Sequence, residues 1–129
     1  MATWDDLVLW VRVRYEVMGQ DGASLTFRLP TGEGRFQRVH VRHKGEVEGQ
    51  DWIQIESPIA PLDAVDLREL LRLVDGAVVG GVAAVGDVAV LRHAAPLGDL
   101  THAEFEVPFR LVTRTADELE HTLTGADRF

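Results

Sequence analysis

Hydrophobic residues near the end of the chain recur at the spacing of one face of an α-helix. The members of this stripe are Phe105, Phe109, Val112, Ala116, Leu119 and Leu123. Steps of three and four residues place side chains on one helical face. Thr101 and Glu104 have the spacing of a capping box, and Gly125 follows the last member of the stripe as a stop signal. We therefore predict a helix over 101–125 that must pack against an apolar surface.

Pro108 falls inside this predicted helix. Proline has no N–H to donate to the carbonyl of Glu104, and it disfavours helical torsions at Val107. A proline in a helix interior costs about 3 kcal/mol. We therefore predict a kink or a break near Val107.

The same spacing predicts two further helices. The first begins at a cap pattern of Thr3 and Asp6, and its stripe consists of Trp4, Leu7, Val8, Val11, Tyr15 and Met18. Residues 11–17 also alternate as a strand would, and we prefer the helix. The second has a staple and cap over 62–67, a stripe of Leu67, Leu70, Leu71 and Val74 that we expect to be buried, and Gly76 as its end.

Alternating apolar and polar residues predict five strands between these helices. They lie around 24–29, 35–44, 52–56, 78–85 and 88–91, and Gly86-Asp87 forms a two-residue turn between the last two. We interpret 19–22 and 45–49 as connections and the proline-containing run 57–61 as a break in the sheet. The order α-β-β-β-α-β-β-α predicts a single α+β domain over 1–129, with two layers: an antiparallel sheet and helices packed on one face.

Composition narrows the classes of function. The chain of 129 residues has no cysteine, which excludes disulfides and thiolate chemistry and fits a reducing compartment. Its formal net charge of −8 disfavours broad binding to nucleic acid or to anionic membranes. The first residues carry no positive region ahead of an apolar run, so we expect no secretory signal and a cytoplasmic protein.

The sequence contains no catalytic, cofactor-binding or metal-binding signature, so we expect a protein that is not an enzyme and has no cofactor. Ser24 and Ser57 are the only serines, and neither lies in a nucleophile elbow. One alternative stays open. Gly80 and Gly81 would lie opposite His93 across the last hairpin, where a cleft could serve a small-molecule-binding or catalytic domain.

The second and third predicted strands suggest a partner-binding surface. If Val39, Val41, Ile53 and Ile55 face the helices, the opposite face carries Phe36, Arg38, His40, Arg42 and Trp52. Aromatic residues and arginines are the types that most often anchor protein interfaces. The plainer interpretation is that a loop covers the aromatic residues and that the arginines pair with neighbours such as Glu56. A nucleic-acid contact through Arg38, Arg42 and Lys44 is disfavoured by the overall negative charge.

The order of elements, together with three stretches, resembles the bacterial type III secretion chaperone-like family. The stretches are Trp4 to Tyr15, Arg35-x-Gln37-x-Val39, and Ala116-Asp117-x-Leu119-Glu120-x-x-Leu123-x-Gly125-x-Asp127. The chain looks most like the YbjN-type branch, whose members are linked to sensory or stress regulation. The resemblance implies a homodimer that holds a polypeptide partner in the cytoplasm and catalyses nothing. Pro108 departs from the uninterrupted last helix of the family, and no partner-binding residue transfers by motif.

Overall fold

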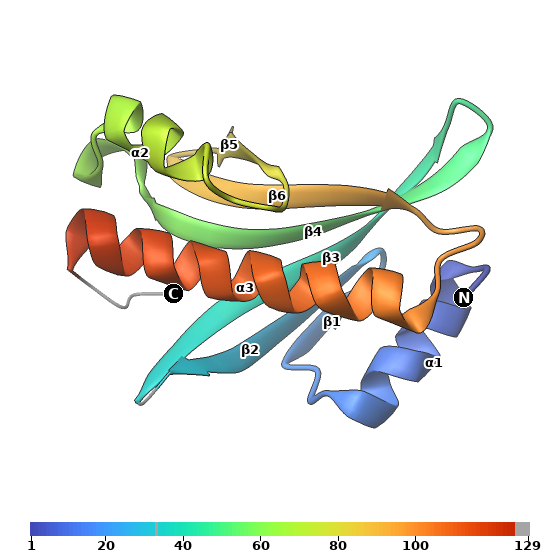
Figure 1. Cartoon of the computed structure of the whole chain (residues 1–129). Helices are drawn as coiled ribbons and strands as arrows, with labels where there is room; N and C mark the ends of the chain where they lie inside the picture. The colour runs from blue at the N-terminus through green and yellow to red at the C-terminus, as the bar shows by residue number, and fades with distance from the viewer. Residues whose placement is uncertain (33, 126–129) are drawn as a thin grey trace.

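A computed structural model describes residues 1–32 and 34–125 as one antiparallel sheet and three α-helices (Figure 1). The elements are α1 (Trp4–Arg14), β1 (Gly19–Asp21), β2 (Ser24–Gly32), β3 (Arg35–Val47), β4 (Gln50–Pro61), a 3-10 turn (Leu62–Ala64), α2 (Leu67–Val74), β5 (Gly81–Val85), β6 (Val88–Pro96) and α3 (His102–Thr124). The six strands lie in the order β1-β2-β3-β4-β6-β5. This confirms the α+β class. Glu33, which lies between the first two predicted strands, and Asp127 of the C-terminal motif lie outside the described residues.

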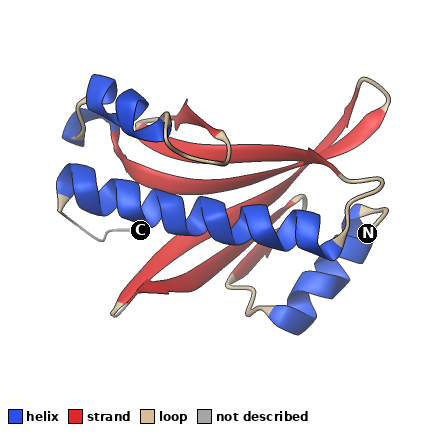
Figure 2. Ribbon diagram, in the orientation of Figure 1, coloured by secondary structure: helices blue, strands red, loops and turns tan. Residues whose placement is uncertain are grey.

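The three helices lie on one side of the sheet (Figure 2). The helix α3 runs nearly along β4 and β6 and obliquely across β2 and β3, with α1 and α2 near opposite ends of the molecule (Figure 1). Val39, Val41 and Ile53 have no exposed surface and Ile55 has 1%. The predicted orientation of β3 and β4 is therefore confirmed, and we call this side the covered face.

The helix α3 is continuous from His102 to Thr124, so of the kink or break predicted near Val107 the break is wrong. The capping box of Thr101 and Glu104 is present at its start, and Gly125 ends it with a φ of 68°. Phe105, Phe109, Val112 and Ala116 have no exposed surface. Burial of this stripe holds the helix together through Pro108, whose missing N–H falls on a solvent-accessible side of the helix rather than in the core.

The N-terminal segment is a helix, as preferred over the strand, but it is shorter than its hydrophobic stripe. It ends at Tyr15, whose backbone is extended, and Met18 lies beyond it with 58% of its surface exposed. Gly19–Asp21, interpreted as a connection, forms the short edge strand β1 against Ser24–Thr26. The observed order therefore has one strand more than predicted.

The strands β3 and β4 are longer than the alternation indicated. The connection between them is only Glu48-Gly49, with φ values of 54° and 75° that suit a two-residue hairpin turn. The predicted break after Glu56 is wrong, because β4 continues to Pro61 through a register shift between Pro58 and Ala60. A bulge is one of the places where a sheet tolerates proline.

The helix α2 is present but shorter than predicted. The expected staple and cap over 62–67 divide into the 3-10 turn Leu62–Ala64 and the N-cap Asp66, whose side chain accepts hydrogen bonds from the backbone N–H groups of Arg68 and Glu69, and the C-cap is Asp75 rather than Gly76. Its predicted buried stripe is wrong in part. Leu70 is fully buried, whereas 50% of Leu67 and 64% of Leu71 is exposed. The helix packs at the margin of the sheet beside β5, so only one edge of its stripe reaches the core.

Candidate functional site

The side of the sheet opposite the helices, which we call the open face, carries a concentration of arginines. Cross-strand pairing places Arg28 on β2 opposite Arg38 on β3, and it places Glu56 on β4 between His40 of β3 and Arg92 of β6. The charged and aromatic residues at the centre and along β3 of this face are Arg28, Phe36, Arg38, His40, Arg42, Trp52, Glu56 and Arg92. All five predicted partner-binding residues lie on it.

Glu56 holds the centre of the open face through two guanidinium groups. Its Oε1 lies 2.9 Å from Nη1 of Arg42, and its Oε2 accepts from Nε and Nη2 of Arg92 at 2.9 and 2.7 Å. The Glu56 side chain is 3% exposed, whereas those of Arg42 and Arg92 are about one-third exposed. Such charge-assisted hydrogen bonds are among the stronger ones in proteins. They hold the side chains of Arg42, Glu56 and Arg92 in place relative to one another.

The positive charge on this face exceeds what Glu56 neutralises. Four guanidinium groups lie on this face, those of Arg28, Arg38, Arg42 and Arg92, and only the last two pair with Glu56. Strand pairing places one further carboxylate on this face, that of Asp21 on the edge strand β1, which leaves a surplus of two positive charges among these groups. Arg28 and Arg38 form no ion pair with any carboxylate of the described residues. The whole chain has a net charge of −8, so this surplus is opposite in sign to the charge of the protein as a whole. Positive charge is thus concentrated on one surface of an acidic protein.

His40 lies within this positive field. Its Nδ1 is 3.0 Å from the hydroxyl of Thr26. Burial lowers the pKa of His40 below its ordinary value of 6.5, and the charges of Arg42 and Arg38 lower it further, while Glu56 acts in the opposite direction. His40 is therefore predominantly neutral at pH 7 and responds to the charge that surrounds it.

The two aromatic residues of the predicted surface do not lie together. Phe36 pairs with Pro30 at one end of β3, where the Arg28 guanidinium carbon lies 4.2 Å from its ring centre and 38% of its surface is exposed. Trp52 pairs with Gly45 near the other end, and its indole N–H donates to the carbonyl of Val47 at 2.9 Å. The separation along β3 is about 30 Å. The surface is an arginine-rich centre with one aromatic residue at each end.

The plainer interpretation of these residues applies to only part of the face. Arg42 does pair with Glu56, as that interpretation expected. Arg38 is exposed and has no such pair, and Phe36 is not covered. Arg28 and Arg92 were not among the predicted partner-binding residues. The alternation of Phe27, Arg28 and Leu29 could have revealed the first, whereas the second required knowing that β6 continues past Leu91.

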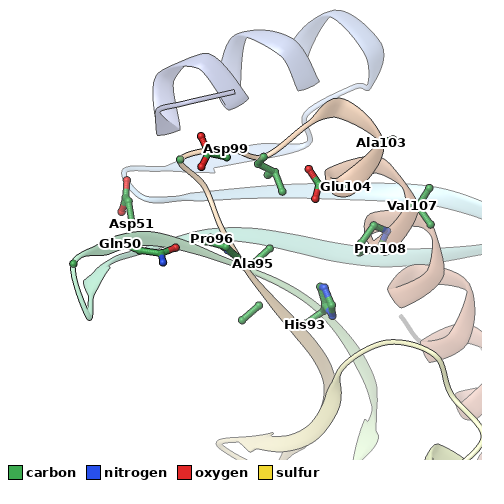
Figure 3. A pocket seen from close by; sticks show the side chains of 14 residues that line it. Gln50, Asp51, His93, Ala95, Pro96, Asp99, Ala103, Glu104, Val107 and Pro108 are labelled. Carbon is green, nitrogen blue, oxygen red and sulfur yellow. The ribbon is translucent and has the colours of Figure 1, made fainter.

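A second concave feature lies on the covered side, between the start of β4, the end of β6 and the first turns of α3. It is a cavity of about 800 Å³ whose walls include His93, Leu100, Glu104, Val107 and Pro108 (Figure 3). The pairing of Gly81 with Arg92 places Gly80 beside His93, as predicted, but neither glycine belongs to the walls of this cavity. A Cβ on Gly80 would lie 2.1 Å from the carbonyl oxygen of Arg92, so this glycine serves close backbone packing.

No protein-family model matches the chain, and no curated protein matches it in sequence. Across residues 1–32 and 34–125, no group of three or more histidine, aspartate or glutamate side chains is arranged to hold a metal ion. None of the helices within those residues combines the length and the apolar character needed to span a bilayer.

Proposed function

We propose that the protein is a non-enzymatic binding module, chaperone-like or regulatory, that holds a polypeptide partner on the open face and acts as a homodimer. The observation that carries the proposal is the uncovered group of four arginines on the sheet of an otherwise acidic chain. The proposed role agrees with what the resemblance to the type III secretion chaperone-like family implies.

The chemistry of the open face favours an acidic segment as the partner. The guanidinium group has a planar fork of donors that matches a carboxylate, and it is weakly hydrated, so it binds carboxylates well at interfaces. Arg28 and Arg38 have this capacity unused by the described residues. Phe36 and Trp52 add aromatic surface at the two ends. An extended segment with spaced Asp or Glu residues fits this pattern.

The proposed homodimer uses a different surface, the exposed apolar side of α2 and β5. Leu67, Leu71, Val78 and Val85 are 50%, 64%, 87% and 41% exposed. The strand β5 is the last in the sheet and contains no charged residue or proline that would block pairing with another strand. A second copy related by a two-fold axis would present the same residues, which makes this patch self-complementary.

A peptide selection tests the partner chemistry. Random peptides displayed on phage are selected on the immobilised protein, and enriched sequences are synthesised with a fluorescent label. We expect enrichment in Asp and Glu, and we expect Arg38→Ala to weaken binding about tenfold by removing a charge-assisted contact. Arg114→Ala is the matched control, since Arg114 is an exposed arginine on α3. Equal binding by the Arg38 variant and the wild type would refute the proposed site.

Sedimentation velocity tests the dimer. We expect Leu71→Asp to convert the dimer into a monomer, because it places a charge in an apolar contact. Leu9→Asp is the control, since Leu9 is 67% exposed on α1 and is therefore similar in exposure but far from the proposed contact. A wild-type protein that sediments as a monomer at micromolar concentration would contradict this part of the proposal.

A further inference from the structure

The cavity at the start of α3 is separate from the open face, because it lies on the covered side of the sheet. His93 projects from β6 at the position opposite Ile55, whose side chain is buried under the helices. Figure 3 shows His93 on the wall formed by the sheet and Val107 and Pro108 on the wall formed by α3. Its volume of about 800 Å³ is in the range of small-molecule sites.

Two hydrogen-bonding groups of this cavity lack the partners that they would ordinarily have. Pro108 has no N–H, so the carbonyl of Glu104 has no donor four residues ahead in α3. Glu104, Val107 and Pro108 all line the cavity, so the turn of the helix that carries this carbonyl borders it. The imidazole of His93 forms no hydrogen bond with another described residue. Both groups can accept a hydrogen bond from a ligand.

The charged side chains of the lining are all carboxylates, those of Asp51, Asp99 and Glu104, and no lysine or arginine belongs to the walls. Asp51 is also bonded to His43 at 2.7 Å, and the N-terminal ammonium of Met1 donates to the carbonyl of Leu100 at 2.7 Å. Hydrogen bonds from Thr101, that of its backbone N–H first, lower the pKa of Glu104, so this group is ionised at neutral pH. Burial lowers the pKa of His93, which leaves the imidazole neutral and able to accept a proton-donating partner.

The remaining walls are apolar. They are formed by Ala94, Ala95, Pro96, Leu100, Val107 and Pro108. A ligand that suits the whole cavity therefore has an apolar body and a group that donates several hydrogen bonds and carries positive charge. A primary ammonium has three donors and no acceptor, so it meets both the charge and the unpaired acceptors.

We propose that this cavity binds a small organic amine, with its ammonium group between the carbonyl of Glu104 and the imidazole of His93 and its apolar body against Leu100, Val107 and Pro108. The cavity also gives Pro108 a role. The proline withholds one hydrogen bond from α3 and leaves an acceptor available to the ligand. No step of this proposal depends on the open face or on the dimer.

Three matched probes test the ligand class. They are 2-phenylethylamine, its neutral counterpart 2-phenylethanol, and the anion 3-phenylpropanoate, each titrated into the ¹⁵N-labelled full chain and followed by amide chemical shifts. We expect only the amine to bind with measurable affinity, at least about tenfold tighter than the alcohol. The shifts should centre on Ala95, Leu100 and Val107. Equal binding of the alcohol, or shifts centred elsewhere, would overturn the proposal.

Two variants test the proposed acceptors. Pro108→Ala restores the N–H that bonds to the carbonyl of Glu104, so we expect weaker amine binding by about tenfold together with a more stable helix. This combination separates loss of the site from loss of the fold. His93→Leu keeps the side-chain volume and removes the ring nitrogen, and we expect a similar loss. His121→Leu, at the exposed far end of α3, is the control. Unchanged amine affinity in both Pro108→Ala and His93→Leu would refute the proposed geometry.

Discussion

The two faces of the sheet differ in whether their side chains find partners within the chain. On the covered face, Phe27, Val39 and Ile53 have no exposed surface, and their contacts lie entirely within the chain. On the open face, Arg42 is paired with Glu56, while Arg38 is exposed and forms no ion pair with a described residue. The covered face is explained by folding alone. The open face holds more positive charge than folding requires, and this difference is why we place the binding function there.

The largest effect should come from the covered face. Phe109 is fully buried, and its ring centre lies 5.2 Å from that of Phe27 and 5.1 Å from that of Phe105. We expect Phe109→Ala to lower the free energy of unfolding by about 3–5 kcal/mol, since it leaves a cavity in the core. Urea denaturation measures this. Val107→Ala, at a site 55% exposed on the same helix, should change stability by less than about 0.5 kcal/mol.

A smaller loss of stability should come from the one structural part of the open face. We expect Glu56→Gln to lower the free energy of unfolding by about 1–3 kcal/mol, because the Arg42 and Arg92 guanidinium groups lose a shared carboxylate. Arg38→Ala should leave stability almost unchanged. If Arg38→Ala destabilised the fold as much as Glu56→Gln, the open face would be structural and the contrast between the faces would fail.

The smallest expected effect is a dependence of partner binding on pH. Arg38 and Arg42 of β3 lower the pKa of His40, Glu56 of β4 raises it, and Thr26 of β2 contacts its ring. An acidic partner should raise this pKa towards or above its ordinary value, so the complex takes up a proton. Affinity should then increase as the pH falls from about 7.5 to 5.5, where the carboxylates of the partner stay ionised.

Fluorescence anisotropy with a selected acidic peptide measures this dependence. His40→Gln should bind with little change over the same pH range. The stability of the free protein should depend on pH in the opposite direction to partner affinity. Because the pKa of folded His40 lies below 6.5, the unfolded chain binds more protons just below that pH, and stability falls as the pH drops. A wild-type affinity that falls with acidification would contradict the binding of an acidic partner beside His40.

Much of the fold followed from the spacing of hydrophobic residues. Alternation oriented β3 and β4 correctly, and the capping box of Thr101 and Glu104 marked the start of α3. The errors share a cause, which is that local signals were overridden by tertiary packing. Pro58 did not end β4, because a bulge accommodates it, and Pro108 did not break α3, because a long buried stripe holds the helix.

The candidate sites were less accessible to sequence reasoning. Alternation placed Phe36, Arg38, His40 and Arg42 on one face, but it did not show that Phe36 and Trp52 lie at opposite ends of it. The pairing of Glu56 with Arg92 depends on β6 lying beside β4, a long-range arrangement that no local pattern encodes. The same is true of the cavity, where His93 and Pro108 come from separate elements.

The most direct test of the central claim is to observe the arginine side chains of the open face while an acidic peptide is added. The Nε–Hε resonances of all the arginines can be followed by NMR and assigned by single Arg→Lys variants. We expect those of Arg28, Arg38, Arg42 and Arg92 to shift with saturation at one common affinity, while that of Arg114 stays in place. Shifts confined to arginines outside the open face, or no shift in these four at saturation, would contradict the account.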